Sequence, residues 1–262
     1  MPEPRRPRTA TPLSAAGQLV DWIRRPLRRL HDRRHHRRLA HSDDRADVFD
    51  SIRALNVWGG TESVSGPGSS LAYTAALRAA LPGLFREFGV RTVFDAPCGD
   101  CHWMPEVLSR TDVQYVGGDI VPALVEANRR RLGGPRAQFR VFDLVVDPFP
   151  AADLWVCRDC LFHLPYRDIH AVLRNFAASG IRYALLTNHR NLTGFRNTDI
   201  RTGGFRRLDL CAEPFLLPAK VEARIREGGE LGDGEHEMCL WEREAIASAL
   251  PGFARQLGLA PE

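Results

Sequence analysis

Three aspartates stand at the ends of short apolar runs, where a parallel sheet would bring them together. Asp95 ends the run 91–95, Asp119 follows 114–118, and Asp143 ends 139–143. Ligands of α/β proteins bind beyond the carboxyl ends of such strands. A carboxylate there can hold a cationic amine, accept the two hydroxyls of a ribose, or receive an exocyclic amine. Each acid alone could simply cap a turn, but together the three predict a site for a cationic amino acid, a ribose and an adenine.

The loop after the first of these runs, residues 95–103, excludes one common ligand. It holds a single glycine, Gly99, where a dinucleotide-binding loop has three. Its acids Asp95 and Asp100 would repel a pyrophosphate, so a nicotinamide oxidoreductase is disfavoured. The same two carboxylates favour a ligand with a cationic part.

Histidines near the strand ends are candidate general bases, since imidazole titrates close to neutral pH. His163 follows the fourth apolar run, 153–157, and is the leading candidate. Asp159 lies four residues before it, which on a helix would place both on one face. Asp159 would then orient the base or contact the substrate. His102 and His189 are further candidates, and a purely structural role for His163 stays open.

Two Cys-x-x-Cys pairs, 98/101 and 157/160, have the spacing of zinc ligands. The first pair flanks the glycine loop that the ligand should occupy, and a buried free cysteine behaves as a small hydrophobe. An Asp159/His163 metal site has too few further ligands. We therefore expect no metal. Six cysteines in 262 residues are too sparse for a disulfide scaffold, which favours a reducing, cytoplasmic setting.

The elements that position these residues alternate between strands and helices from residue 91 onward. Further strands are expected at 182–187, 220–227 and 237–241, and helices at 71–88, 122–131 and 166–179. Strands that are continuously apolar are buried on both faces. The pattern predicts an α/β fold with a doubly wound parallel sheet.

The chain divides into three parts by composition. Residues 1–41 carry 11 Arg against three acids, a net charge of +8, although the whole chain carries only +4. This basic arm, partly disordered or helical over 14–40, could touch a membrane surface weakly, hold nucleic acid, or be a solvated extension. Residues 42–90 should form a helical cap with a Gly/Ser-rich lid at 58–70, and residues 91–262 the Rossmann-like domain. The long stretch 189–219 should help to build an acceptor pocket.

The run 93–100, Val-Phe-Asp-Ala-Pro-Cys-Gly-Asp, resembles motif I of class I S-adenosylmethionine-dependent methyltransferases. Asp119 resembles the motif II acid and Asp143 the motif III acid of that family. A bacterial subgroup with a D-x-P-C-G-D motif I is similar over more of the chain, roughly residues 55–245. The similar stretches are 58–66, 97–100 with Trp103, 157–164, and 197–200 with Gly203 and Arg206.

This resemblance implies a Rossmann-like seven-stranded sheet, S-adenosyl-L-methionine as cofactor, and methyl transfer. The cofactor-binding residues would be Asp95, Ala96, Pro97, Cys98, Gly99, Asp100, Asp119, Ile120, Asp143, Leu144 and Arg158. The catalytic residues would be His163 and Asp159, and the substrate residues Trp58, His102, His189, Asp199 and Arg206.

The expected reaction is O-methylation of a small polar molecule or a sugar or glycan hydroxyl, with no nucleic-acid partner. Methylation of base amines is disfavoured, because enzymes of the wider family that do this usually carry an Asn/Asp-Pro-Pro-aromatic motif where this chain has Cys157-Arg-Asp-Cys160. Two alternatives remain open from the sequence. One is an RNA methyltransferase that uses the basic arm, and the other a non-catalytic module with the cofactor-binding fold.

Overall fold

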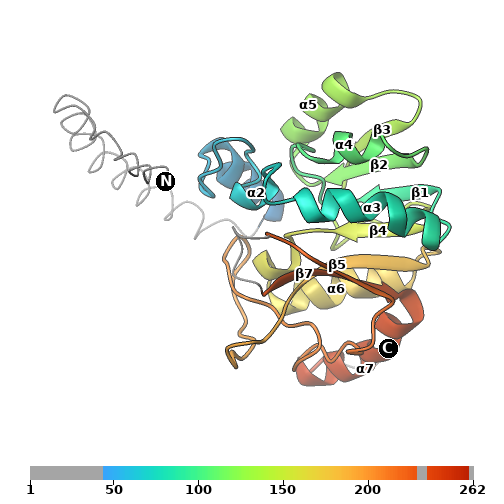
Figure 1. The fold of residues 1–262 in the computed structure, drawn as a ribbon. Coiled ribbons are helices and arrows are strands. Elements are labelled where there is room, and N and C mark those ends of the chain that lie inside the picture. The colour runs from blue at the N-terminus through green and yellow to red at the C-terminus, as the bar shows by residue number, and fades with distance from the viewer. Residues whose placement is uncertain (1–43, 229–234, 260–262) are drawn as a thin grey trace, which may run out of the picture. The chain divides into compact units, whose positions relative to one another are not determined.

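A computed structural model describes residues 44–228 and 235–259. The basic arm, 1–41, lies outside these residues. Seven strands form one sheet in the order β3-β2-β1-β4-β5-β7-β6 (Figure 1). The first five strands are parallel, and β7 runs antiparallel to both of its neighbours. The strands are β1 (Thr92–Asp95), β2 (Gln114–Asp119), β3 (Ala137–Val141), β4 (Leu154–Cys157), β5 (Tyr183–His189), β6 (Ala223–Arg226) and β7 (His236–Glu242).

Helices cover both faces of the sheet, because successive residues of its central strands point to opposite faces. Val93 joins a hydrophobic cluster with α3 (Ala75–Glu87), α4 (Met104–Leu108) and α5 (Pro122–Leu132). Phe94, the next residue, joins a second cluster with α6 (Tyr166–Ala177) and α7 (Arg243–Gln256). The helix α2 (Arg45–Ala54) precedes this three-layer core. The predicted doubly wound fold is therefore confirmed.

The register of the strands brings the carboxyl ends of the central strands together. Asp95, the last residue of β1, pairs with Gly117 of β2 and with Val156 of β4. The chain leaves β1 for β2 on one side and later returns to β4 on the other. A crevice opens where the strand order reverses in this way, and α/β proteins bind ligands there.

Several elements differ from the sequence predictions. β3 ends at Val141, so Asp143 lies two residues beyond the strand rather than at its last position. The helix α3 begins at Ala75 instead of Leu71, because Ser70 caps a preceding turn by accepting the amide of Tyr73. The helix α7 was not predicted.

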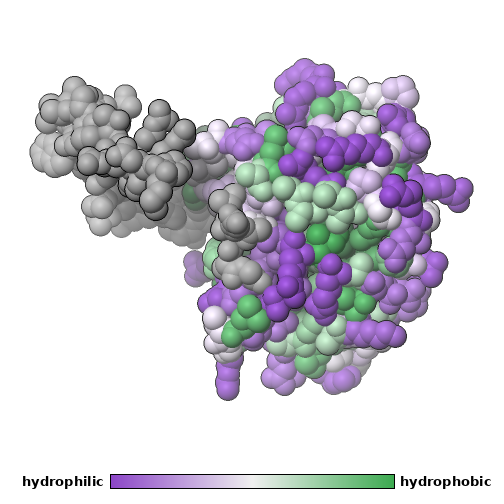
Figure 2. Space-filling model, in the orientation of Figure 1, coloured by the Kyte–Doolittle hydropathy of each residue, from purple (hydrophilic) through white to green (hydrophobic). Residues whose placement is uncertain are grey.

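The stretch from 190 to 222 contains no helix or strand, yet it is not a loose loop. Four of its apolar side chains, Leu208, Leu210, Phe215 and Leu217, are buried in the cluster that includes α6 and α7. On the face that Figure 2 shows, hydrophilic residues are spread widely, with hydrophobic residues between them. Within the described ranges, none of the helices combines the length and the apolar character that crossing a bilayer requires.

Candidate functional site

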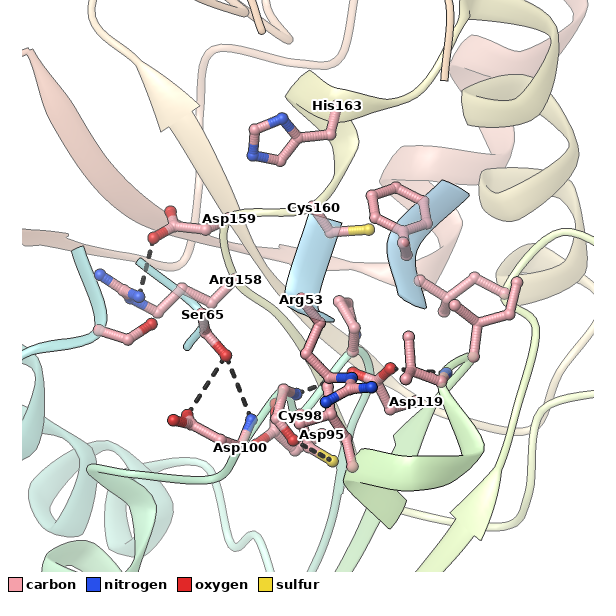
Figure 3. A pocket seen from close by; sticks show the side chains of 18 of the residues that line it. Arg53, Ser65, Asp95, Cys98, Asp100, Asp119, Arg158, Asp159, Cys160 and His163 are labelled. Atoms are coloured by element: carbon pink, nitrogen blue, oxygen red, sulfur yellow. Dashed lines mark hydrogen bonds and ion pairs between the residues drawn. The ribbon is translucent and has the colours of Figure 1, made fainter. Parts of the chain in front are cut away.

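A pocket of about 1050 Å³, its mouth included, lies at the carboxyl ends of β1, β2 and β4. Figure 3 shows three carboxylates, Asp95, Asp100 and Asp119, toward one end, with His163 at the other. The predicted site residues that line the pocket are Trp58, Asp95, Pro97, Cys98, Gly99, Asp100, His102, Asp119, Ile120, Asp143, Leu144, Arg158, Asp159 and His163.

Asp119 is held by the backbone rather than by a cation. Its two carboxylate oxygens accept the amides of Gly99 and Val121, each at 2.9 Å. Burial nevertheless raises the pKa of Asp119 to about 6, because desolvation outweighs those two bonds. Each oxygen keeps a further lone pair with which it can accept a ligand hydroxyl.

Asp95 is also buried, and no cation among the described residues is paired with it, although the charge of Arg158 acts on it from a distance. The Tyr115 hydroxyl donates to its carboxylate at 2.7 Å, and burial raises the pKa of Asp95 to about 7. Across the described residues, neither Asp95 nor Asp119 takes part in an ion pair. This end of the pocket thus carries buried acids that a cationic ligand would stabilise.

Asp100 holds the lid segment, which we define as residues 58–74, against the loop after β1. Its carboxylate accepts the hydroxyls of Ser63 and Ser65 and the amide of Val64, at 2.8, 3.2 and 3.1 Å. Gly99 sits directly beneath, with a φ of +54°, and a Cβ there would lie 2.3 Å from the Ser65 hydroxyl. Only glycine permits the lid to approach this closely.

His102 belongs to the same contact between lid and loop. Its Nε2 lies 2.8 Å from the carboxylate of Glu62, which also accepts the amide of Leu71. His102 does line the pocket. Its hydrogen bond makes it part of the lid anchor.

Asp143 is engaged differently from its predicted role. One carboxylate oxygen receives the guanidinium of Arg45 at 2.7 Å, and the other accepts the amide of Val145 at 2.9 Å. The carboxylate already has a charged partner, although it still lines the pocket. Its use for an exocyclic amine stays a prediction.

Asp159 and His163 do not share a helical face, so that expectation was wrong. Asp159 has a φ of +53°, outside any helix, and His163 ends a short 3₁₀ turn, Leu161–His163. Burial alone would raise the pKa of Asp159, but Arg158 at 2.8 Å and His236 at 2.7 Å hold it well below its ordinary value. Asp159 is therefore a fixed anion rather than a proton acceptor.

His163 presents a lone pair on the wall of the pocket. Its Nδ1 lies 2.6 Å from the carbonyl oxygen of Gly204, which can only accept, so Nδ1 carries the ring hydrogen. The neutral ring then has its free lone pair on Nε2. Trp58 stacks on the ring at 5.0 Å between centroids, and burial lowers the pKa of His163, which favours the neutral form.

Four predicted site residues do not line this pocket. Ala96 is buried in the sheet, where its amide and carbonyl bond to Val156 and Trp155. His189 lies in the core, where its Nδ1 accepts the amide of Leu208.

The other two, Asp199 and Arg206, belong to the stretch 190–222. Asp199 accepts the amide of Tyr166 at the start of α6, as a cap does. Arg206 is buried, and it donates to the carbonyl oxygen of Phe162. Asp199 therefore supports the start of α6, and Arg206 supports the turn that carries His163.

The cysteines are free thiols, and burial raises the pKa values of Cys98, Cys101 and Cys157. Over the residues that the structure describes, no three His, Cys, Asp or Glu side chains gather as metal ligands would.

Sequence reasoning missed two groups of residues near the pocket. The helix α2 contributes Arg45, Phe49 and Arg53 to its lining. The strands β6 and β7 bring Glu227 and His236 to Arg158 and Asp159. The only available signal was His236, beside the strand predicted at 237–241. Its pairing with Asp159 joins segments far apart in the sequence and leaves no local pattern.

Comparisons with known proteins agree with this geometry. Residues 93–179 match the family model of a methyltransferase domain. No curated protein sequence matches the chain.

Solved structures share the fold at low sequence identity. The human N-acetylserotonin methyltransferase structure has a TM-score of 0.53 at 14% identity, over 74% of this chain and 58% of that one. Mitomycin 7-O-methyltransferase MmcR has 0.53 at 16%, over 78% and 60%. TnmH has 0.55 at 19%, over 75% and 58%. The chain thus spans less than two thirds of these proteins. Residues 93–179 thus match a methyltransferase domain, and the sheet shares the fold of solved methyltransferases, one of them in complex with S-adenosylmethionine.

Proposed function

We propose that the protein methylates a hydroxyl group of a small molecule, with His163 as the general base. The observation that carries this proposal is the hydrogen bond from His163 Nδ1 to the Gly204 carbonyl, which leaves the Nε2 lone pair for an acceptor. A hydroxyl needs such a base more than an amine does, because it must lose its proton as it attacks.

The cofactor fits the carboxylate end of the pocket. S-adenosylmethionine supplies, when bound, an activated methyl group on a positively charged sulfur. Asp95 suits its cationic amino-acid part because the acid is buried with no cation bonded to it. Asp119 suits the ribose hydroxyls, because its oxygens are fixed by two amides and retain lone pairs.

The acceptor would lie at the other end, between His163 and α2. Phe49, Trp58 and Leu164 give this end an apolar, partly aromatic lining. Such a lining favours a flat acceptor, either a phenol or the apolar face of a sugar ring. The similarity to mitomycin 7-O-methyltransferase supports an O-linked small-molecule acceptor.

In this scheme the acceptor oxygen loses its proton to the base as it receives the methyl group. The acceptor hydroxyl gives its proton to His163 Nε2 as its oxygen forms the new bond to the methyl carbon. Bound S-adenosylmethionine would supply the methyl group and would keep the electron pair of its carbon–sulfur bond on sulfur. Asp159, pinned by Arg158 and His236, contributes a fixed negative charge near the developing imidazolium.

The test is a product analysis with labelled methyl donor and a panel of acceptors. Phenols and sugars should gain one methyl group on oxygen, whereas amines and single-stranded RNA should gain none. Methylated RNA would favour the alternative that depends on residues 1–41. Binding of S-adenosylhomocysteine without turnover of any acceptor would favour a non-catalytic module.

A further inference from the structure

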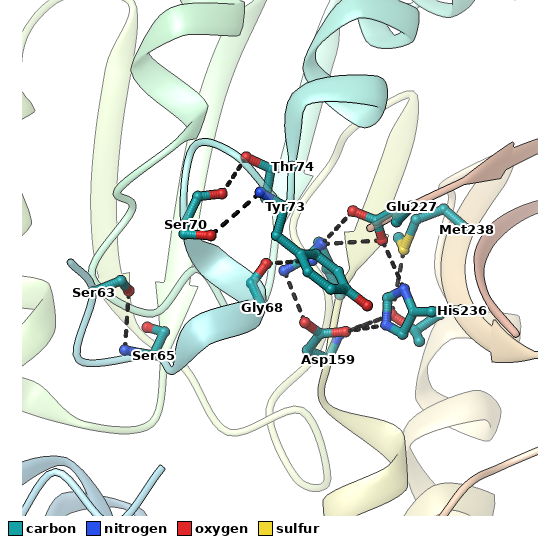
Figure 4. A network of polar contacts seen from close by, with 12 residues as sticks. Ser63, Ser65, Gly68, Ser70, Tyr73, Thr74, Asp159, Glu227, His236 and Met238 are labelled. Atoms are coloured by element: carbon teal, nitrogen blue, oxygen red, sulfur yellow. Dashed lines mark hydrogen bonds and ion pairs between the residues drawn. The ribbon is translucent and has the colours of Figure 1, made fainter. Parts of the chain in front are cut away.

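Four charged side chains form a closed cluster beside the pocket (Figure 4). Arg158, at the end of β4, is buried and pairs with Glu227 at 2.9 Å and with Asp159 at 2.8 Å. A single guanidinium between two carboxylates leaves one negative charge unbalanced. Burying such a charge is costly unless another cation is present.

His236 supplies the second cation. Its Nε2 lies 2.7 Å from Asp159 and its Nδ1 lies 3.2 Å from Glu227. The first contact is a hydrogen bond, and the second is a looser ion pair, since Nδ1 has no aligned hydrogen-bond acceptor. Both ring nitrogens face carboxylates, which only the doubly protonated ring can satisfy.

The cluster also holds the lid. The Arg158 Nη2 donates to the carbonyl oxygen of Gly68 at 2.7 Å, and a Cβ at Gly68 would lie 3.1 Å from an oxygen of Asp159. Tyr73, at the end of the lid segment, places its ring against both His236 and Arg158. This is the second anchor of the lid, on the opposite side from Asp100.

We propose that doubly protonated His236 is a positioning residue that fixes Arg158. Through its hydrogen bond to Gly68, Arg158 then keeps the lid segment closed over the loop after β1. This inference rests on the cofactor occupying the carboxylate end of the pocket, but not on the identity of the acceptor. Without the His236 charge, the excess negative charge would pull Arg158 fully toward its carboxylates. The bond to Gly68 would weaken, and the cofactor would leave more easily.

The surroundings of His236 set the sign of its pH dependence. Burial alone would lower the pKa of His236, but the hydrogen bond to Asp159 and the ion pair with Glu227 raise it to about 9. The rings of Tyr73 and His189 also pack against the His236 ring, the latter at 5.4 Å between centroids. The two chain neighbours of His236, Glu235 just before β7 and Glu237 within it, pair with Arg207 and Arg224. The charged cluster is therefore intact below about pH 9 and is lost as the pH rises through that value.

A binding series on the full chain tests the proposal. The probe is 5′-methylthioadenosine, which has no amine that titrates between pH 7 and 10. In the wild-type protein its affinity should fall roughly tenfold between pH 7.5 and 10. His236→Gln should bind about tenfold more weakly at pH 7.5 and show little further change with pH. Hydrogen exchange of the peptide 58–74 should be faster in this variant at pH 7.5.

Matched controls separate the effect of the His236 charge from the titration of other side chains. His170→Gln changes a histidine that packs on Phe253, away from the pocket, and should reproduce the wild-type series. Cys160→Ser removes a thiol of the pocket wall and should keep the fall in affinity. If His236→Gln does not fold, the pH series of the wild-type protein and of Cys160→Ser still test the proposal. A wild-type affinity that is flat to pH 10, or a fall abolished in Cys160→Ser, would overturn the proposal while leaving O-methylation untouched.

Discussion

The two ends of the pocket hold acids in opposite electrostatic states. Asp95 and Asp119 accept hydrogen bonds only from a neutral hydroxyl and from amides, and burial raises their pKa values to about 7 and about 6. Asp159 lies between two cations, Arg158 and His236, and its pKa is lowered.

We infer a separate role for each end of the pocket from this difference in charge state. A buried carboxylate that lacks a counter-ion is costly in the empty protein and is stabilised when a cation arrives. A carboxylate that is already neutralised gains nothing from a cationic ligand, but it can fix its neighbours in place. We infer that the first end binds the cationic cofactor and that the second positions the lid and the base.

The largest effect that the comparison predicts is on turnover at the second end. His163→Ala removes the only lone pair that we assign to proton transfer, so kcat should fall by roughly 10²–10⁴-fold. The affinity for S-adenosylhomocysteine should stay the same. In the wild-type enzyme the acidic limb of the pH–rate profile should lie below the ordinary pKa of histidine, because burial lowers the pKa of His163.

Steady-state kinetics of His163→Ala and of His102→Ala, compared side by side, measure this. Near-normal turnover of His163→Ala with its acidic limb retained would remove the base from the second end. His102 would then be the remaining histidine on the pocket wall.

A smaller effect is expected on cofactor binding at the first end. Asp119→Asn places an amide group against the donors of Gly99 and Val121 and removes acceptors for the ribose. The affinity for S-adenosylhomocysteine should weaken by about 1–3 kcal/mol, measured by calorimetric titration. Asp112→Asn, at an exposed aspartate that pairs with Arg136 and does not line the pocket, is the control and should bind normally. An unchanged affinity in Asp119→Asn would take this carboxylate out of the site.

The smallest effect concerns the lid at its Asp100 anchor. Ser65→Ala removes a hydroxyl that both donates to the Asp100 carboxylate and accepts its amide. We expect S-adenosylhomocysteine to bind more weakly by ~0.5–1.5 kcal/mol, with kcat little changed. Ser248→Ala, on α7, removes a hydroxyl far along the sequence from the lid and serves as the comparison. Should Ser65→Ala lower kcat as strongly as His163→Ala, the separation of the two ends would fail.

The sequence predicted the first end of the pocket better than the second. The strand runs that end near Asp95 and Asp119 are local patterns, and the register of a parallel sheet brings their ends together without further information. The methyltransferase resemblance and the sheet were confirmed for the same reason.

The second end depends on long-range contacts that no local pattern encodes. The tautomer of His163 depends on Gly204, and the charge state of Asp159 depends on His236. The four-residue spacing of Asp159 and His163 suggested a helix, but a left-handed residue and a 3₁₀ turn stand there instead. The arginine-rich stretch 189–219 resembled a substrate loop, whereas its apolar residues bury it against the core.

Proton release on cofactor binding tests the contrast between the two ends most directly. Because burial raises the pKa of Asp95 to about 7, much of this acid is protonated at pH 6.5 and must lose its proton to pair with the cation. Because this pKa is raised in the folded state, protonation of Asp95 increases the free energy of unfolding of the ligand-free protein as the pH falls through 7. The measurement is calorimetric titration with S-adenosylmethionine at pH 6.5 in two buffers of different ionisation enthalpy. We predict release of a substantial fraction of a proton, up to about one, in the wild-type protein and markedly less in Asp95→Asn. Binding without proton release, or equal release by Asp95→Asn, would contradict the account.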